Sequence, residues 1–103
     1  MNKKNIIYDY RALEEYEKLP EKVQDKFKIY INILRKTGYL TKPKGKKLVK
    51  GLYEVRVKMD GAWRGLYAYR KVDKIILLVF FKKKSNKTPI KEMLKALNRL
   101  RTY

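Results

Sequence analysis

The chain has 103 residues, which suits a single domain, and its 45% hydrophobic and 13% aromatic content is enough to fill a core. It contains neither cysteine nor histidine, which excludes disulfides and metal sites built from thiolate or imidazole ligands. Ten carboxylates among 28 cations are a poor setting for a metal ion. We therefore expect one domain over residues 1–103, with no metal and no other cofactor.

The net charge of +18 and the pI near 10.1 indicate a polyanionic partner, which in a cell is most often nucleic acid or the ribosome. A lysine-rich proteome is the alternative explanation, but it should raise glutamate together with lysine. No apolar run approaches the roughly 18 residues of a membrane span. The N-terminal "MNKKNIIYDYR" also lacks the apolar segment of a signal peptide. These features predict a cytoplasmic protein without membrane association.

The first half of the chain is typical of a strand followed by two helices. "NIIYDY" (5–10) predicts a short strand, and Asp9 is a suitable cap for a helix over "YRALEEYEKL" (10–19). Pro20 and Gly38 bound a second helix. This helix carries one apolar stripe at helical spacing, formed by Val23, Phe27, Tyr30, Ile31 and Leu34. Two helices joined at a proline predict an antiparallel helix hairpin.

The second half predicts three strands and a closing helix. A lysine-rich loop (39–52) leads to "LYEVRVKM" (52–59), in which apolar and charged residues alternate. Asp60-Gly61 predicts a hairpin to "WRGLYAYR" (63–70), and "IILLVFF" (75–81) is apolar on both faces, as in a central strand. Residues 90–103 predict an amphipathic helix. The order β-α-α-β-β-β-α predicts an α+β domain, an antiparallel sheet with its helices on one face.

Charged residues gather on the predicted sheet face away from the helices. Strand alternation places Glu54, Arg56 and Lys58 on that face, and Arg64 joins them if the hairpin register is suitable. The last strand then runs into Lys82, Lys83 and Lys84. Cations from three neighbouring strands are thus predicted to converge on one surface, although Arg56 and Lys58 would also fit an ordinary solvent-exposed face.

The remaining lysines are better suited to phosphate contact than to catalysis, because such contacts need only charge and reach. A solvated loop is the ordinary alternative for lysines of this kind. The residues predicted to bind RNA or the ribosome are Lys44, Lys46, Lys47, Lys50, Lys82 and Lys87.

Two stretches carry a resemblance to a known family. "KKLVKGLYEVRV" and "FFKKKSNKTP" match, in type and order, the patterns K-L-x-x-G-L-Y-E-L-R and F-x-K-K-x-x-K-T-P. With "LPEKVQDKF", "LRKTG" and "WRGLYAYR", the chain resembles over nearly its whole length the RelE/ParE superfamily of toxins from type II toxin–antitoxin systems. The resemblance is to the HigB-like, phage-derived branch, and it implies the same β-α-α-β-β-β-α fold.

The resemblance implies a ribosome-dependent endonuclease that cuts mRNA in the ribosomal A site and is held inactive by a cognate antitoxin, often a helix-turn-helix protein. Cleavage without a metal drives the 2′-hydroxyl into the adjacent phosphate, and Arg56, Arg64 and Lys83 occupy the cationic positions that would stabilise the developing charge. Two departures stand out. Gly65 lies in a segment where the family usually has Y-R-(I/V)-L-Y, and the chain lacks the histidine that some relatives use.

The proton acceptor stays open between two kinds of residue. Glu54 is the only carboxylate on the charged strand and is favoured as the base, although its cationic neighbours would keep it ionised and make it a weak base, and it could merely pair with Arg56 or Lys58. A lysine with a lowered pKa could serve instead, with Lys58 or Lys84 as candidates. Two functions other than a ribosome-dependent mRNA endonuclease stay open. One is a ParE-like toxin that poisons DNA gyrase, and the other is a basic RNA- or ribosome-binding module without catalysis.

Overall fold

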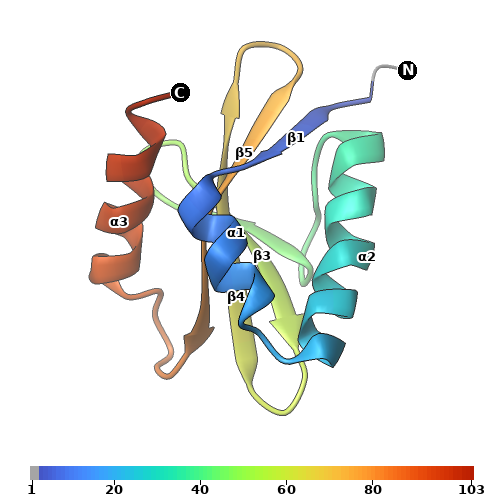
Figure 1. Ribbon diagram of the computed structural model, residues 1–103, viewed down its shortest axis with the longest axis vertical. Coiled ribbons are helices and arrows are strands. Elements are labelled where there is room, and N and C mark those ends of the chain that lie inside the picture. Colours follow the sequence, from blue (N-terminus) through green and yellow to red (C-terminus); the bar gives the residue numbers. More distant parts are fainter. Residues whose placement is uncertain (1–2) are drawn as a thin grey trace.

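The computed structural model describes residues 3–103 as three helices and a five-stranded sheet (Figure 1). The elements in chain order are β1 (Asn5–Tyr8), α1 (Tyr10–Glu17), α2 (Glu21–Thr37), β2 (Gly45–Lys47), β3 (Tyr53–Lys58), β4 (Ala62–Arg70), β5 (Lys74–Lys83) and α3 (Ile90–Leu100). The predicted α+β class and order are confirmed. The structure adds β2, a three-residue strand inside the lysine-rich loop.

The sheet has the strand order β1-β5-β4-β3-β2. All neighbours are antiparallel except β1 and β5, which run parallel, with Ile6 beside Ile75 and Tyr8 beside Leu77. Parallel neighbours require a long connection, and here the chain between β1 and β5 contains both N-terminal helices and three strands. This pairing joins segments about 70 residues apart in the sequence, so local sequence patterns could not predict it.

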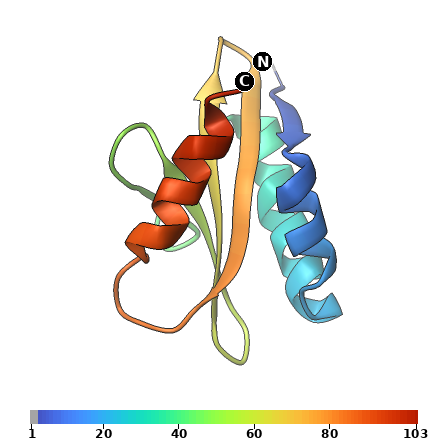
Figure 2. The same ribbon diagram turned by 60° about the vertical axis from the view of Figure 1, so that its left-hand side comes forward.

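Helices cover both faces of the sheet, whereas the sequence had led us to expect all of them on one (Figure 2). On one face α1 and α2 bury a core that includes Tyr16, Phe27 and Phe80. On the other, α3 buries a second core that includes Leu66, Leu78 and Leu100. The reason is that β4 and β5 are apolar on both sides, so each face needs its own cover.

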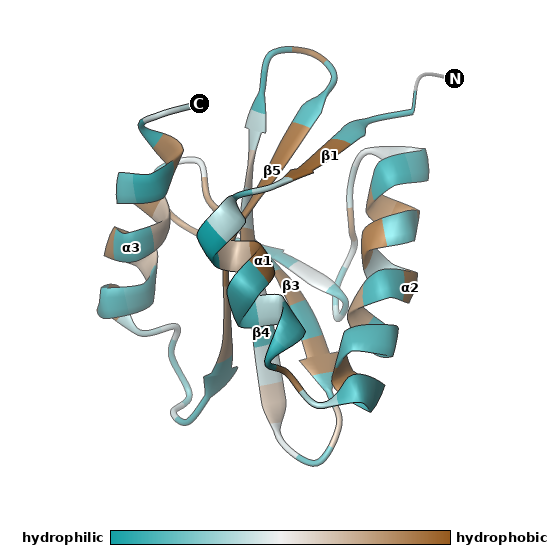
Figure 3. Cartoon of the chain, in the orientation of Figure 1, coloured by the Kyte–Doolittle hydropathy of each residue, from teal (hydrophilic) through white to brown (hydrophobic). Residues whose placement is uncertain are grey.

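The helix ends follow the predicted signals. The Asp9 side chain accepts hydrogen bonds from the backbone N–H groups of Arg11 and Ala12 at the start of α1, and Gly38 ends α2 in the left-handed conformation. Figure 3 shows the hydropathy of the residues along α2, and the stripe residues Val23, Phe27, Ile31 and Leu34 are buried in the core. Tyr30 differs from the rest of that stripe because it is only partly buried.

The β3–β4 hairpin forms where Asp60-Gly61 predicted it. Both residues have positive φ, 49° and 133°, which Asp and Gly accept more readily than other residues. The turn sets a register in which Arg56 lies directly beside Arg64. The two arginines therefore share one face of the sheet, as the alternation required.

A β-bulge interrupts the pairing of β4 with β5. Leu66 pairs with Val79 but Tyr67 pairs with Leu77, so Leu78 is an extra residue in β5. Leu78 and Val79 consequently both face α3, and the alternation beyond them is inverted. The bulge thus puts Phe81 and Lys83 on the α3 face and Lys82 on the opposite face.

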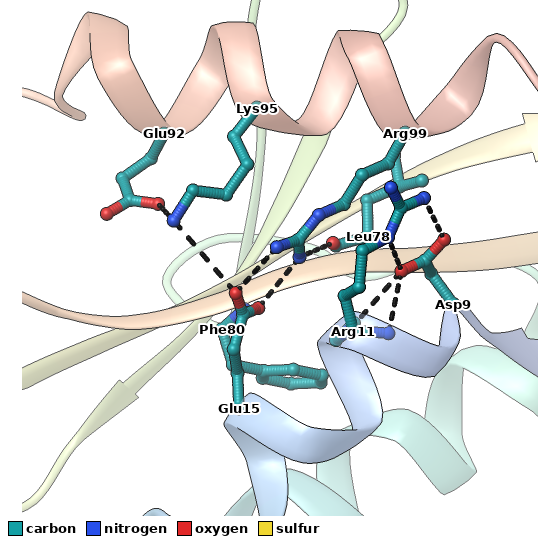
Figure 4. A network of polar contacts seen from close by, with 9 residues as sticks. Asp9, Arg11, Glu15, Leu78, Phe80, Glu92, Lys95 and Arg99 are labelled. Carbon is teal, nitrogen blue, oxygen red and sulfur yellow. Dashed lines mark hydrogen bonds and ion pairs between the residues drawn. The ribbon is translucent and has the colours of Figure 1, made fainter.

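The edge of β5 beyond β1 is covered by polar side chains from two helices (Figure 4). Glu15 of α1 accepts a hydrogen bond from the backbone N–H of Phe80 (3.1 Å), and Arg99 of α3 donates to the carbonyl oxygen of Leu78 (2.8 Å). Arg99 and Glu15 also pair directly, at 2.9 Å. These contacts satisfy strand groups that β1 leaves unpaired and join α1 to α3. No helix within residues 3–103 is long and apolar enough to cross a membrane.

Candidate functional site: a cationic cluster around Glu54

A buried carboxylate lies at the centre of the charged face of the sheet. Glu54 in β3 is 1% exposed, and its Oε1 lies 3.6 Å from the Nε of Arg56 and 3.6 Å from the Nε of Arg64. The other oxygen, Oε2, accepts a hydrogen bond from the Thr88 hydroxyl at 2.8 Å. Two cations and one neutral donor thus hold this carboxylate in place.

Arg64 is the more deeply buried of the two arginines, at 7% exposure. One terminal nitrogen donates to the carbonyl oxygen of Trp63 (2.9 Å), and its Nε has no hydrogen-bond acceptor among residues 3–103. Burial lowers the pKa of Arg64, the Glu54 carboxylate opposes that effect, and Arg56 adds to it. The guanidinium group of arginine stays charged in proteins. Arg64 therefore has a free Nε–H donor and more positive than negative charge around it. An added anion would relieve both.

Lys83, the last residue of β5, belongs to the same cluster. Burial lowers its pKa, and so does the charge of Arg64, while Glu54 acts in the opposite direction and Arg56 and Lys46 lower it further. The strand register agrees: Lys83 pairs with Ala62, two residues before Arg64, and lies on the same face of the sheet as Arg64. Cations from β3, β4 and β5 thus come together on the sheet face that α3 covers, whereas the sequence had led us to expect the charged face to lie away from the helices.

A cavity of about 550 Å³ opens beside the arginines, at the edge of β3 beyond the end of β2. Three cations that were predicted to be catalytic, Arg56, Lys58 and Arg64, line it from the sheet, and Lys44 lines it from the loop before β2. Its volume lies within the range of about 300–1,000 Å³ that small-molecule sites occupy. The residues that line it are Lys26, Tyr30, Pro43, Lys44, Arg56, Val57, Lys58, Ala62 and Arg64.

The other predicted residues lie at varied distances from this cluster. Lys46 lies directly opposite Glu54 in the β2–β3 strand register, whereas Lys84 and Lys87 are exposed in the loop before α3. Lys82 lies on the opposite face, with its ammonium group 5.2 Å from the centroid of the Trp63 ring.

The last two loop lysines are separate from the cavity. Lys47 is an exposed residue at the end of β2, and Lys50 lines a different groove, together with Leu94 and Arg101 near the end of α3. Of the lysines predicted to contact RNA, Lys44 and Lys46 are thus the ones that lie beside the cationic cluster.

Three residues of the site were not singled out from the sequence. Thr88 belongs to the "KTP" motif, but nothing in the pattern showed that it would donate to Glu54. Tyr30 was counted as part of the apolar stripe of α2, and Lys26 carried no signal. Both come to the cavity because α2 packs against β3.

Gly65, which departs from the family pattern, has a structural explanation. A Cβ at this position would lie 2.8 Å from Cε1 of Phe80 and 3.5 Å from Cε1 of Phe27. Phe80 in turn packs against the rings of Tyr16 and Phe27, with centroids 5.2 and 5.1 Å away. The glycine thus lets an aromatic cluster approach β4 directly beneath Arg64.

The donor set of the site does not suit a metal ion. Glu54 is its only carboxylate, and it is surrounded by cations. Within residues 3–103 no three Asp or Glu side chains come together in a way that could hold a metal.

Comparisons with known proteins bear on family and fold. Residues 14–101 match the family described as "Phage derived protein Gp49-like (DUF891)". Among solved structures, the chain is similar to a free-state structure of a double arginine-to-alanine mutant of the Escherichia coli toxin RelE, with a TM-score of 0.73 and 16% identity over 97% of this chain and 99% of that chain. A comparison with curated protein sequences finds no match. The chain therefore belongs to the phage-derived Gp49-like family and has the RelE fold, which confirms its resemblance to the RelE/ParE superfamily.

Proposed function

We propose that this protein is the toxin of a type II toxin–antitoxin system and acts as a ribosome-dependent mRNA endonuclease in the cytoplasm. The observation that carries the proposal is the convergence of Arg56, Arg64 and Lys83, from three strands, beside an open cavity. Such a cluster fits a phosphodiester whose negative charge increases during reaction. The net charge of +18 supports the ribosome and its mRNA as partners.

The proposed reaction uses the 2′-hydroxyl of the RNA itself, the cations of the site and water. The 2′-hydroxyl loses its proton and attacks the adjacent phosphorus, the bond to the 5′-oxygen breaks, and that oxygen takes a proton from water. The products are a 2′,3′-cyclic phosphate and a free 5′-hydroxyl. Arg64 and Arg56 would donate to the phosphorane oxygens, and removing one donor of this kind typically costs about 2.7–4 kcal/mol of barrier.

The sequence favoured Glu54 as the proton acceptor, with Lys58 or Lys84 as alternatives, but we propose Lys83 instead. Its lowered pKa increases the fraction of neutral amine, which is the form that accepts a proton. Glu54 has each oxygen engaged by Arg56, Arg64 or Thr88, which supports a positioning role for this carboxylate. Lys58 lines the cavity and Lys84 is exposed beyond β5, which supports a role of both in RNA contact.

The partner that inhibits the toxin would be a cognate antitoxin, a helix-turn-helix protein encoded by the neighbouring gene. A cationic cluster next to an open cavity is complementary to an acidic segment, and occupying it would exclude mRNA. Co-purification of the two products tests this: we expect a stable complex that 1 M NaCl weakens, and a toxin that is harmless and monodisperse alone would count against it.

The main test is expression in bacteria of the wild type and of Arg64→Ala, Arg56→Ala and Lys83→Ala. Arg70→Ala is a matched control, because Arg70 lies in β4 like Arg64 but at its other end, where its Nε donates to the carbonyl oxygen of Tyr103. We expect the wild type and the control to stop growth and to produce mRNAs cut within codons, mapped by primer extension. The three site variants should restore growth while remaining folded.

The alternatives give different outcomes in the same experiment. A DNA-damage response with intact mRNA would indicate a gyrase poison. Harmless expression of the wild type would indicate a binding module without catalysis. If all three site variants stay lethal, the catalytic site lies elsewhere.

A further inference from the structure

The cavity beside the arginines is also lined by residues that have no role in the proposed reaction. Tyr30 and Lys26 reach it from α2, and Lys44 reaches it from the loop before β2. The ammonium groups of Lys26 and Lys44 each lie 5.5 Å from the centroid of the Tyr30 ring. An aromatic ring with two cations beside it thus faces the same space as Arg56 and Arg64.

Tyr30 differs from the other aromatic residues of the α2 side. Tyr16 and Phe27 are almost fully buried in the core, whereas Tyr30 packs against that core with one part of the ring and stays partly exposed. Tyr30 is therefore an aromatic residue of α2 that both contacts the core and lines the cavity with part of its surface exposed.

We propose that Tyr30, with Lys26 and Lys44, forms a subsite for a nucleobase of single-stranded RNA next to the scissile phosphate. This rests on the proposed function, in which Arg56 and Arg64 hold that phosphate. Every base has a π face, so an aromatic side chain in a cationic groove binds single strands by stacking. Neighbouring phosphates would draw the two ammonium groups away from the ring, and the base would take the position that they vacate.

The layout of the cavity matches a nucleotide. Arg56 and Arg64, whose guanidinium groups suit a phosphate, line it from the sheet, and Tyr30 with its two neighbouring cations lines it from α2 and from the loop before β2. The volume of about 550 Å³ leaves room for a base and its sugar between them. Tyr30 would thus be a positioning residue: it aligns the nucleotide without touching the reacting atoms.

The test measures binding of a short 2′-O-methyl oligoribonucleotide, which cannot be cleaved, by fluorescence anisotropy. A second probe has the same sequence with one abasic position, which is moved along the oligonucleotide. For the wild type, one abasic position should weaken binding by on the order of 5- to 150-fold. Tyr30→Leu keeps an apolar side chain but has no π face, and it should weaken binding of the intact probe by a similar factor. It should also remove the difference between the two probes.

Two further variants separate stacking from structure. Tyr30→Phe keeps the ring and should bind like the wild type. Tyr10→Ala is the matched control, because the Tyr10 ring also has a cation beside it, Arg11 at 4.8 Å, but lies at the start of α1 and outside the cavity. It should leave both affinities unchanged.

The inference and the proposed function fail in different ways. Equal losses for the intact and abasic probes in Tyr30→Leu, or no loss at all, would overturn the base subsite even if Arg64→Ala abolishes mRNA cleavage. Absence of cleavage by the wild type would overturn the endonuclease, whereas the binding measurements would still decide whether Tyr30 stacks on a base.

Discussion

Neutralising Glu54 should destabilise the protein strongly, because its carboxylate compensates two arginines. Arg64 is 7% exposed, and the Glu54→Gln variant would leave its charge buried beside Arg56 and Lys83. Removing one partner of a buried ion pair typically costs 3–5 kcal/mol. The separations of 3.6 Å exceed hydrogen-bond length and Arg56 is partly exposed, so we expect the lower end, about 3 kcal/mol in the free energy of unfolding.

The measurement is urea unfolding followed by the fluorescence of Trp63, which is the single tryptophan and is buried. A loss of this size corresponds to a fall in Tm of roughly 12–24 °C in a domain of this length. Glu17→Gln is a control, because Glu17 is an exposed residue at the end of α1, and it should change stability by less than about 0.5 kcal/mol.

A second substitution distinguishes charge imbalance from other causes. Combining Glu54→Gln with Arg64→Met removes both buried charges, and this should recover at least half of the stability that Glu54→Gln loses. If Glu54→Gln is as stable as the wild type, the reasoning that Glu54 compensates the buried charge of Arg64 is wrong.

Three other predictions follow from pKa values and packing. Since the pKa of Lys83 is lowered, the cleavage rate should rise with pH and level off below 10.5, the ordinary lysine value, whereas Lys83→Arg should lose about 10²–10⁴-fold and the plateau with it. Burial by itself would raise the pKa of Asp9, but hydrogen bonds from Arg11 and Tyr103 lower it to about 2. A carboxyl group whose pKa is lower in the folded protein stabilises the fold at pH values above its unfolded pKa, and this stability is lost as pH falls through the folded pKa. The wild type should therefore lose about 2 kcal/mol of stability as pH falls from 4 through 2, and Asp9→Asn should not. Gly65→Ala should cost about 1–3 kcal/mol, because its Cβ meets the Phe80 ring, and adding it to Phe80→Leu should cost less; equal costs in both backgrounds would exclude that clash.

The order of the elements was readable from the sequence because local patterns determine it. Asp9 and Gly38 bound helices through their own backbone and capping chemistry, and Asp60-Gly61 accepts the positive φ values of a turn. The period of two in β3 placed Glu54 and Arg56 on one face without any knowledge of the rest of the chain. These are properties of neighbouring residues.

Tertiary structure decided which residues meet at the cavity. The bulge at Leu78 inverted the alternation of β5, so that Lys83 and not Lys82 faces Arg64. Thr88 reached Glu54 from 34 residues away. Helix periodicity assigned Tyr30 to the core stripe, yet its half-exposed position beside Lys44 depends on how α2 packs on β3. Contacts between distant segments depend on how whole helices and strands pack together, and the residues next to a given position in the sequence do not determine them.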